Sequence, residues 1–424
     1  MSALATALAR RGIFFGWWVV VASGTTLFLT AGTFFYGFST LFNPIVAEFG
    51  WSRASVSLAF SLRSNLGGIA APLVGYLVDR MGSRRLMIAG VLFVSAGFVL
   101  MSQMQTLLWF YGSVFVIAVG MSATGGAVGT TAVAHWFSRR RGRALSYMAM
   151  GTGTSGVMVL VLEFLISSFG WREALLVIAG AQLLVCLPMA WSIQDYPSDI
   201  GLQPDGEPAP PPPEDGSAAP VQVREGMTVR EALRSPAFWK MAASIGLVNI
   251  GLIAIIVHLI PFLTGSLDFT DGQAAAAFTT MILLSLIGRF VVGQLSDRVD
   301  TKYVLAGACA FAGASLVLFA TLYEPWQIVY TLPVYAFGWG GLLPVRAAFQ
   351  ADYFGTKAFG AIQGIVFTVA QVGGLVGPVF AGYMFDQTES YRLAFLILSA
   401  GALVSVPLAL SITPPVKQNV DVKV

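Results

Sequence analysis

Long apolar stretches alternate with short polar ones along nearly the whole chain. Most of the apolar stretches hold about 20 or more residues, the length that an α-helix needs to cross the hydrocarbon core of a bilayer. They lack the alternation over about ten residues that marks strands of membrane barrels, so the pattern predicts α-helices. The predicted spans are residues 13–41, 53–78, 85–103, 106–135, 143–168, 172–193, 237–264, 272–295, 302–321, 327–350, 358–384 and 392–412.

One polar stretch, residues 194–235, is much longer than the others. It contains EPAPPPPEDGSAAP, whose proline content is typical of an extended, flexible linker. Thr228 and Glu231 follow with the spacing of a capping box, which predicts a short amphipathic surface helix before the seventh span. We therefore expect an N-terminal six-helix bundle over 1–193, a cytoplasmic linker over 194–235, and a C-terminal six-helix bundle over 236–424.

The two halves of the chain resemble each other in two of their loops. GYLVDRMGSRR begins at Gly75 and GQLSDRVDTKY begins at Gly293, an offset of 218 residues. AHWFSRRRGRAL and ADYFGTKAFGAI, which begin at Ala134 and Ala351, are offset by 217 residues. Two matches at nearly one offset indicate two all-α bundles related by a pseudo-two-fold axis. In transporters with such repeats, the substrate site lies between the bundles near the middle of the membrane.

Composition supports a membrane protein and excludes several other classes. The chain has 424 residues, of which 56% are hydrophobic and only 11% are charged, whereas about 25% of a soluble domain is charged. The net charge of +3 is spread over many short loops, which argues against nucleic acid as a partner. Cys186 and Cys309 each lie alone in an apolar run, as packing residues do. The sequence holds no Walker-type phosphate loop and no catalytic or metal-ligand cluster, so we expect neither a cofactor nor enzymatic activity.

Lysine and arginine residues gather in the loops on one side of the predicted spans, and Arg346 is counted with these loop residues. The positive-inside rule places that side, and with it both termini, in the cytoplasm. The first apolar run follows basic residues, as in a signal peptide, but it continues to about Phe42 without a clear cleavage site. We therefore expect it to be the first span of an integral protein of the cell inner membrane.

The first repeated loop resembles the signature of the major facilitator superfamily, Gly-x-x-x-Asp-Arg-x-Gly-x-Arg-Arg. The matching residues are Gly75, Asp79, Arg80, Gly82, Arg84 and Arg85, and the weaker copy keeps Gly293, Asp297 and Arg298. This resemblance implies twelve transmembrane helices in two six-helix bundles. It also implies that Asp79, Arg80, Arg84, Arg85, Asp297 and Arg298 belong to a cytoplasmic charge network that latches the bundles while the substrate site faces outward.

Three further stretches are similar to the monocarboxylate transporter branch of that superfamily and its oxalate/formate antiporter relatives. They are GWWVVVASG at 16–24, WFSRRRGRALSYMAMGTG at 136–153, and SPAFWKM at 235–241. The resemblance covers the whole chain. It implies a bacterial relative of the animal transporters that move L-lactate with a proton, working by alternating access as a monomeric transport unit.

Two residues depart from the animal pattern. Animal members carry a lysine near the middle of the first span, whereas the first lysine here is Lys240 and Tyr36 lies near the equivalent position. Animal members also place an aspartate one turn before the arginine of the eighth span, where this chain has Ser285. Proton coupling by those two groups therefore does not carry over to this chain.

Arg289 is the strongest candidate for binding substrate. It lies eight residues before the inner end of the eighth span, about 12 Å deeper if the segment is helical. An arginine at mid-bilayer costs roughly 2.5–3.5 kcal/mol, and it stays charged there. A carboxylate can accept two parallel N–H bonds from the guanidinium fork, so a carboxylate substrate can serve as the counter-ion. The alternative is an arginine that pairs with helix ends or a distant acid and serves packing alone.

Two pairs of residues lie at a similar depth in the tenth and eleventh spans. Tyr335 and Trp339, and likewise Gln363 and Phe367, are spaced i, i+4 and share a helix face. Together they predict an apolar wall around a small organic acid, with a hydroxyl and an amide to orient it. Ordinary helix packing is the alternative for each aromatic residue.

His258 is the one histidine that lies well inside a predicted span. An ordinary imidazole titrates close to neutral pH, so His258 and Arg289 are the candidates for proton coupling. A histidine that hydrogen-bonds to a neighbouring helix is the alternative.

The sequence therefore predicts a secondary active transporter for a small monocarboxylate anion, such as L-lactate, together with a proton. Carboxylate exchange is an alternative. Oxalate exchange favours a second deep cation, which the eleventh span lacks because Lys357 lies at its start. A non-transporting sensor on the same fold, which would bind a partner through the linker, is a third possibility.

Overall fold

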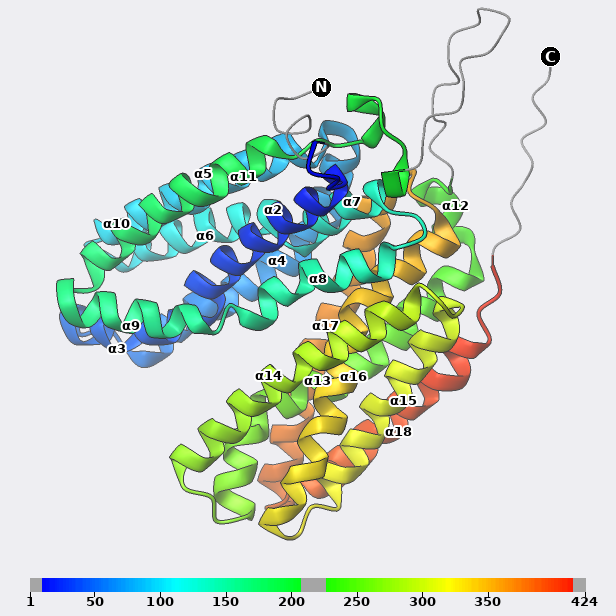
Figure 1. The fold of residues 1–424 in the computed structure, drawn as a ribbon. Coiled ribbons are helices and arrows are strands. Elements are labelled where there is room, and N and C mark those ends of the chain that lie inside the picture. The colour runs from blue at the N-terminus through cyan, green and yellow to red at the C-terminus, as the bar shows by residue number, and fades with distance from the viewer. Residues whose placement is uncertain (1–9, 207–225, 415–424) are drawn as a thin grey trace, which may run out of the picture.

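The computed structural model describes residues 10–206 and 226–414, and helices make up most of this part of the chain (Figure 1). Within it, 11 helices are long and apolar enough to cross a membrane. A further long helix, α4 (Arg53–Met81), has 29 residues and a length of about 43 Å, more than a bilayer core requires. The protein is an all-α membrane protein with twelve long helical segments, as the sequence predicts.

The N-terminal half is built from segments that are often interrupted. Gly125 separates two helices in an extended conformation, and Ser155 and Gly156 interrupt another long segment. The elements are α2 (Phe15–Thr30), η1 (Ala31–Tyr36), α3 (Phe38–Phe49), α4, α5 (Ser83–Ser102), α6 (Leu107–Thr124), α7 (Gly126–Trp136), α8 (Arg141–Thr154), α9 (Val157–Phe169), α10 (Trp171–Ala181), η2 (Gln182–Cys186) and α11 (Leu187–Ser192).

The C-terminal half is more regular and consists mainly of six long helices. They are α13 (Pro236–Ser266), α14 (Asp271–Ser296), α15 (Thr301–Ala320), α16 (Ile328–Phe354), α17 (Phe359–Thr388) and α18 (Arg392–Leu410). Arg346, which the sequence analysis counted with the loop residues, lies inside α16, eight residues before the last residue of that helix. That placement was wrong because α16 continues through Gln350 and Asp352 before it ends.

The short helix predicted ahead of the seventh span is present as α12 (Val229–Arg234). Its capping box is confirmed. The Glu231 backbone N–H donates to Thr228 Oγ1 at 3.3 Å, and the Thr228 N–H donates to the Glu231 carboxylate at 2.7 Å. The second of these bonds lowers the pKa of Glu231. The proline-rich stretch at 207–220 lies outside the described residues.

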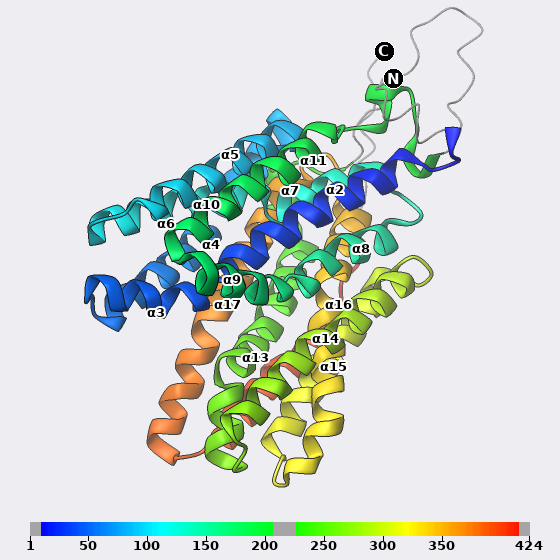
Figure 2. The same cartoon turned by 60° about the vertical axis from the view of Figure 1, so that its left-hand side comes forward.

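The two halves meet at the end of the molecule near α12 and diverge toward the opposite end (Figures 1 and 2). We call these the closed end and the open end. The main contacts between the halves join α4 to α17, α8 to α14 and α16, and α7 to α17. The hydrophobic core follows the same pattern. One cluster at the closed end combines N-terminal residues such as Phe15 and Trp136 with Ala347, Ala348 and Phe359 of the C-terminal half.

Close backbone approach holds α13 against α17, and glycine makes that approach possible. A Cβ atom on Gly377 would overlap the carbonyl oxygen of Ile250. A Cβ atom on Gly374, one turn away, would stand 3.4 Å from Ile253 and 3.5 Å from Asn249, which is close to ordinary contact. The two glycines therefore form a matched pair for testing this packing.

We predict that Gly377→Ala lowers the stability of the purified protein by about 1–3 kcal/mol, since an added methyl group forces two backbones apart. Gly374→Ala should change it little, because the new contact is ordinary and alanine favours the helix. Thermal unfolding in detergent, followed by circular dichroism, measures both midpoints. Equal midpoints for the two variants would contradict this account of the interface.

Candidate functional site

Arg289 lies in the middle of α14 with a side chain that is only 1% exposed. Its guanidinium reaches across to the other half of the protein. There Nη1 donates to the Ala149 carbonyl oxygen at 2.5 Å and to Thr152 Oγ1 at 2.9 Å, both on α8. Gly153 allows this approach, since a Cβ atom there would stand 2.6 Å from Nη1. The sequence GTGTSG in α8 thus provides space for the cation that α14 supplies.

No carboxylate of the described residues pairs with Arg289, and its buried Nε has no hydrogen-bond partner among them. The guanidinium carbon lies 5.7 Å from the centre of the Trp339 ring. The Tyr36 side chain lies close enough to interact with it electrostatically. Arg289, Trp339 and Tyr36 therefore come together from α14, α16 and η1, with neutral dipoles and an aromatic face as the only compensation for the charge.

Two other predicted site residues are held inside the C-terminal half. Tyr335 is fully buried and its hydroxyl donates to the Leu252 carbonyl oxygen at 2.7 Å. The Ser285 hydroxyl donates at 2.6 Å to Ile282, within its own helix. Tyr335 also packs against Trp339, with ring centres 6.4 Å apart. In this structure both residues shape the surroundings of Arg289 without directing a free hydroxyl toward it.

Gln363 and Phe367, both on α17, lie on the closed-end side of the interface. Thr130 Oγ1 of α7 donates to Gln363 Oε1 at 2.8 Å, so this amide joins the two halves. The Phe367 ring lies beneath the guanidinium of Arg346, 5.9 Å from its carbon atom. The shared helix face predicted for the pair is thus an interface face, and it lies beside a cation that the sequence analysis did not single out.

His258 is hydrogen-bonded within the C-terminal half. Its Nε2 lies 2.9 Å from the Pro378 carbonyl oxygen and its Nδ1 lies 3.2 Å from the Tyr391 hydroxyl. A carbonyl oxygen only accepts, so Nε2 donates and Nδ1 of the neutral ring accepts from the Tyr391 hydroxyl. Because that hydroxyl can also act as an acceptor, the ring can take up a proton without losing either partner. The described contacts of His258 join α13 to α17 and α18 and do not reach Arg289.

Two aspartates of the repeated loops cap helices of the opposite half. Asp79, at the end of α4, accepts from the backbone N–H groups of Gly360 at 3.0 Å and Ala361 at 2.9 Å, in the first turn of α17. Asp297, just after α14, accepts from those of Gly142 at 2.6 Å and Arg143 at 3.2 Å, in the first turn of α8. Each carboxylate satisfies unpaired N–H groups and meets the positive end of a helix dipole.

The two contacts obey the internal repeat. Gly142 and Gly360 are separated by the same 218 residues as Asp79 and Asp297. Both glycines sit where the backbones nearly touch. A Cβ atom on Gly360 would stand 2.6 Å from the carbonyl oxygen of Gly75, and one on Gly142 would overlap that of Gly293. The glycine and the aspartate of the signature therefore act together, since the first allows the approach that the second uses.

The basic residues of the signature make no such contacts across the interface in the described part of the chain. Arg80 lies over Tyr76 of its own helix, with 5.4 Å between the guanidinium carbon and the ring centre. Arg84 lies over Trp191 at the same distance, within the N-terminal half. Arg85 and Arg298 are exposed.

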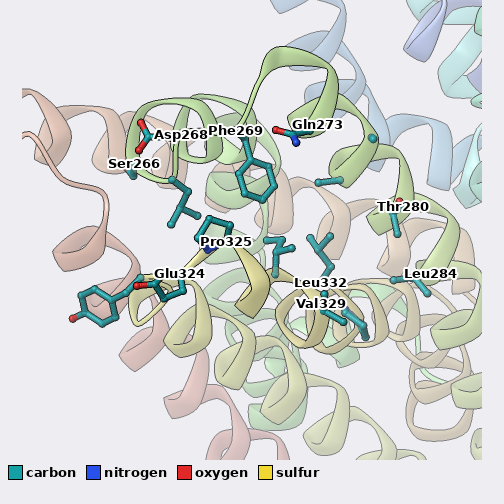
Figure 3. Close-up of a pocket in the computed structure, with 16 residues that line it drawn as sticks. Ser266, Asp268, Phe269, Gln273, Thr280, Leu284, Glu324, Pro325, Val329 and Leu332 are labelled. Atoms are coloured by element: carbon teal, nitrogen blue, oxygen red, sulfur yellow. The ribbon is translucent and has the colours of Figure 1, made fainter.

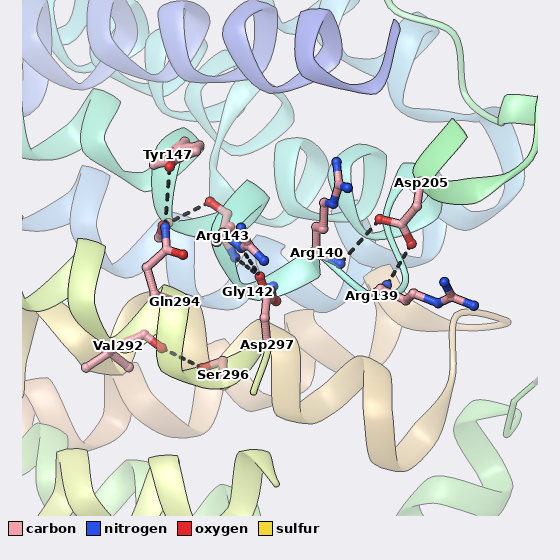
Figure 4. Close-up of polar contacts among 11 residues, drawn as sticks. Arg139, Arg140, Gly142, Arg143, Tyr147, Asp205, Val292, Gln294, Ser296 and Asp297 are labelled. Atoms are coloured by element: carbon pink, nitrogen blue, oxygen red, sulfur yellow. Dashed lines mark hydrogen bonds and ion pairs between the residues drawn. The ribbon is translucent and has the colours of Figure 1, made fainter. Parts of the chain in front are cut away.

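Different arginines complete the closed end, and the sequence analysis did not identify them. Arg143 Nε donates to Asp297 at 2.9 Å, and Arg141 pairs with Asp352 at 3.0 Å (Figure 4). Beside them, Asp205 accepts from the backbone of Arg139 at 2.7 Å (Figure 4). The repeat offset could have revealed the Asp297 contact, because it relates Arg143 to a residue beside the signature aspartate. Nothing in the sequence marks Asp352 as the partner of Arg141.

A separate pocket of about 850 Å³ lies at the open end of the C-terminal half, between the α13–α14 turn and the start of α16 (Figure 3). Of the described residues that line it, none is basic, and Asp268 and Glu324 contribute negative charge. A carboxylate would be repelled there. We therefore place the candidate anion site at Arg289 rather than in this pocket.

The fold and the symmetric contacts at the closed end define the class of the protein. The family model of the Major Facilitator Superfamily matches residues 24–342 and 260–423, and the chain belongs to this family of transporters. The chain is 26% identical to Monocarboxylate transporter 13 of Bos taurus over 421 residues, covering 96% of this chain and 92% of the relative. It is 23% identical to the Oxalate:formate antiporter of Oxalobacter formigenes, covering 91% of this chain and 90% of the relative.

Among solved structures, the fold is similar to that of the transporter FucP in the outward conformation. The TM-score is 0.71 at 16% sequence identity, and the match covers 93% of this chain and 99% of FucP.

We predict that Asp79→Ala and Asp297→Ala each weaken the closed end by about 0.5–2 kcal/mol, the usual cost of losing a helix cap. The two effects should roughly add, because the sites are separate. A cysteine introduced at Thr130, in a background without Cys186 and Cys309, reports opening through its rate of maleimide labelling. Each variant should label about 2- to 30-fold faster than the parent.

Asp300→Ala provides the control for this experiment. Asp300 accepts from the Lys302 backbone at 2.9 Å and caps α15 within one half. Its loss removes a cap without touching the interface, so the labelling rate should stay at the parent value. Equal acceleration by all three variants would show that the two aspartates stabilise their own bundles instead of the closed end.

Proposed function

We propose that the protein is a secondary active transporter that moves a small monocarboxylate, such as L-lactate, together with a proton by alternating access. The printed names of its relatives, a monocarboxylate transporter and an oxalate:formate antiporter, support a small carboxylate as the substrate class. The proposal places the protein in the cell inner membrane as a monomeric transport unit with both termini in the cytoplasm, following the distribution of Lys and Arg. The closed end then faces the cytoplasm.

The uncompensated charge of Arg289 carries the proposal. A permanent cation buried between two bundles is costly without an anion, and no acid of the described residues supplies one. A carboxylate that enters from the open end would find the guanidinium fork, the Trp339 ring and the Tyr36 hydroxyl within a small region. Because Arg289 already binds α8 from α14, its partners change whenever the bundles move. Substrate binding is thereby coupled to the conformational change.

Carboxylate exchange is the second candidate, and the geometry around Arg289 favours it in one respect. Ser285 occupies the position where animal members carry an acid, and its hydroxyl is bonded within α14. A proton acceptor in contact with Arg289 is therefore missing among the described residues, and an exchanger needs none. In the symport mechanism, His258 is the remaining candidate for the proton.

We predict that Arg289→Ala reduces uptake of labelled L-lactate into proteoliposomes by at least about thirtyfold, the effect of removing a buried charged partner. Arg289→Lys should also abolish uptake, because a point charge cannot replace the planar fork. Arg230→Ala, at an exposed position on α12, is the matched control and should transport normally. Normal uptake by the alanine variant would remove Arg289 from the mechanism.

We also predict that acid outside stimulates uptake and that a protonophore abolishes accumulation, since a coupled proton supplies the driving force. The measurement uses proteoliposomes with and without an imposed pH gradient. If the gradient has no effect but preloaded carboxylate accelerates uptake, the protein is an exchanger. If the protein moves no carboxylate under either condition, the non-transporting alternative remains.

A further inference from the structure

Arg346 is a second cation inside the membrane-spanning part of the chain. It lies in α16, eight residues before the end of the helix, and is half-buried. Its buried Nε has no hydrogen-bond partner, and the described residues supply neither an ion pair nor a hydrogen bond to the rest of the guanidinium. Its one described contact is the Phe367 ring at 5.9 Å. Such a charge needs a partner that is absent from the chain itself.

The position of Arg346 relative to Arg289 follows from contacts between α14 and α16. These helices run in the same direction, with Gly288 against Phe337 and Gly341 against Val292. By this register, the backbone of Arg346 lies about 12 Å nearer to the closed end than that of Arg289. Trp339 and Arg346 are spaced i, i+7 and share one face of α16. The Trp339 ring that contacts Arg289 therefore points along the same side as Arg346.

Arg346 also lies between Arg289 and the contacts that keep the closed end shut. Phe367, beneath its guanidinium, follows Gly360 by seven residues, or about 10 Å along α17, and Gly360 is bound by Asp79. The next residues of α16, Ala347 and Ala348, pack into the core cluster shared with the N-terminal half. Arg346 is thus at the border of the interface that must open for release toward the closed end.

We propose that Arg346 forms a second carboxylate-binding group, which receives the substrate from Arg289 when the closed end opens and holds it before release. This inference rests on the proposed function and assigns one step of it to a particular side chain. When the bundles separate at the closed end, α17 and α7 part beside Arg346, and its guanidinium becomes accessible to an anion. Two cations in series provide a favourable path through an interior that otherwise offers no partner to a carboxylate.

The proposal separates binding from translocation. Arg346→Gln should bind labelled L-lactate with an affinity within about threefold of the parent, because Arg289 forms the site that faces the open end. Exchange of L-lactate across proteoliposomes should fall at least about tenfold, as for loss of a hydrogen bond to a charged group. Arg346→Lys, which keeps the charge, should recover much of the exchange. Retained binding by the glutamine variant also shows that it is folded.

Phe367→Leu tests the packing alternative, because it removes the ring contact and keeps the charge. It should exchange L-lactate at nearly the parental rate. The proposal is overturned if Arg346→Gln exchanges normally, if Phe367→Leu loses exchange as strongly, or if Arg346→Gln loses binding together with exchange, which would make Arg346 part of the first site. Failure of the parent protein to bind or move L-lactate would instead count against the proposed function.

Discussion

A permanent positive charge in the middle of a membrane-spanning helix is the constraint on which the arrangement around it depends. The guanidinium of Arg289 cannot be left to lipid, so α8 brings the Ala149 carbonyl oxygen and the Thr152 hydroxyl to it, and Gly153 leaves the space. These groups are dipoles and reduce the cost of burial without neutralising the charge. The two halves are therefore joined at a point that remains attractive to an anion.

The closed end uses a different interaction for the same purpose of joining the halves. Asp79 and Asp297 each supply the carboxylate that the first turn of a helix in the other half lacks. A cap in trans of this kind has a moderate strength, about 0.5–2 kcal/mol each, and it is broken by a small displacement. Interfaces that must open repeatedly need contacts of this size, whereas the glycine-mediated packing of α13 on α17 lies within one bundle and does not need to open.

The central region combines two unpaired cations with few groups that could answer them. Arg289 and Arg346 contact the aromatic faces of Trp339 and Phe367, which offer a weak attraction to cations. The hydroxyl groups of Tyr335 and Ser285 and both nitrogens of His258 are occupied within the C-terminal half. Positive charge without a carboxylate nearby is thus a property of the interface itself, while the polar groups around it keep the C-terminal bundle rigid.

The sequence by itself determined the membrane class, the twelve helices and the importance of Arg289. Length and hydropathy decide whether a segment spans a bilayer, and an isolated charge in an apolar run is visible without coordinates. The repeat offset already related the two aspartates that cap the opposite halves. Which groups meet across the interface was decided by the tertiary structure. The partners of Arg289 lie some 140 residues away on α8, Asp352 is one polar residue among many until α16 is placed beside α8, and Arg346 resembles a loop residue until α16 is seen to continue past it. Contacts between helices depend on the register and rotation of both partners, and neither is encoded in the local pattern of either one.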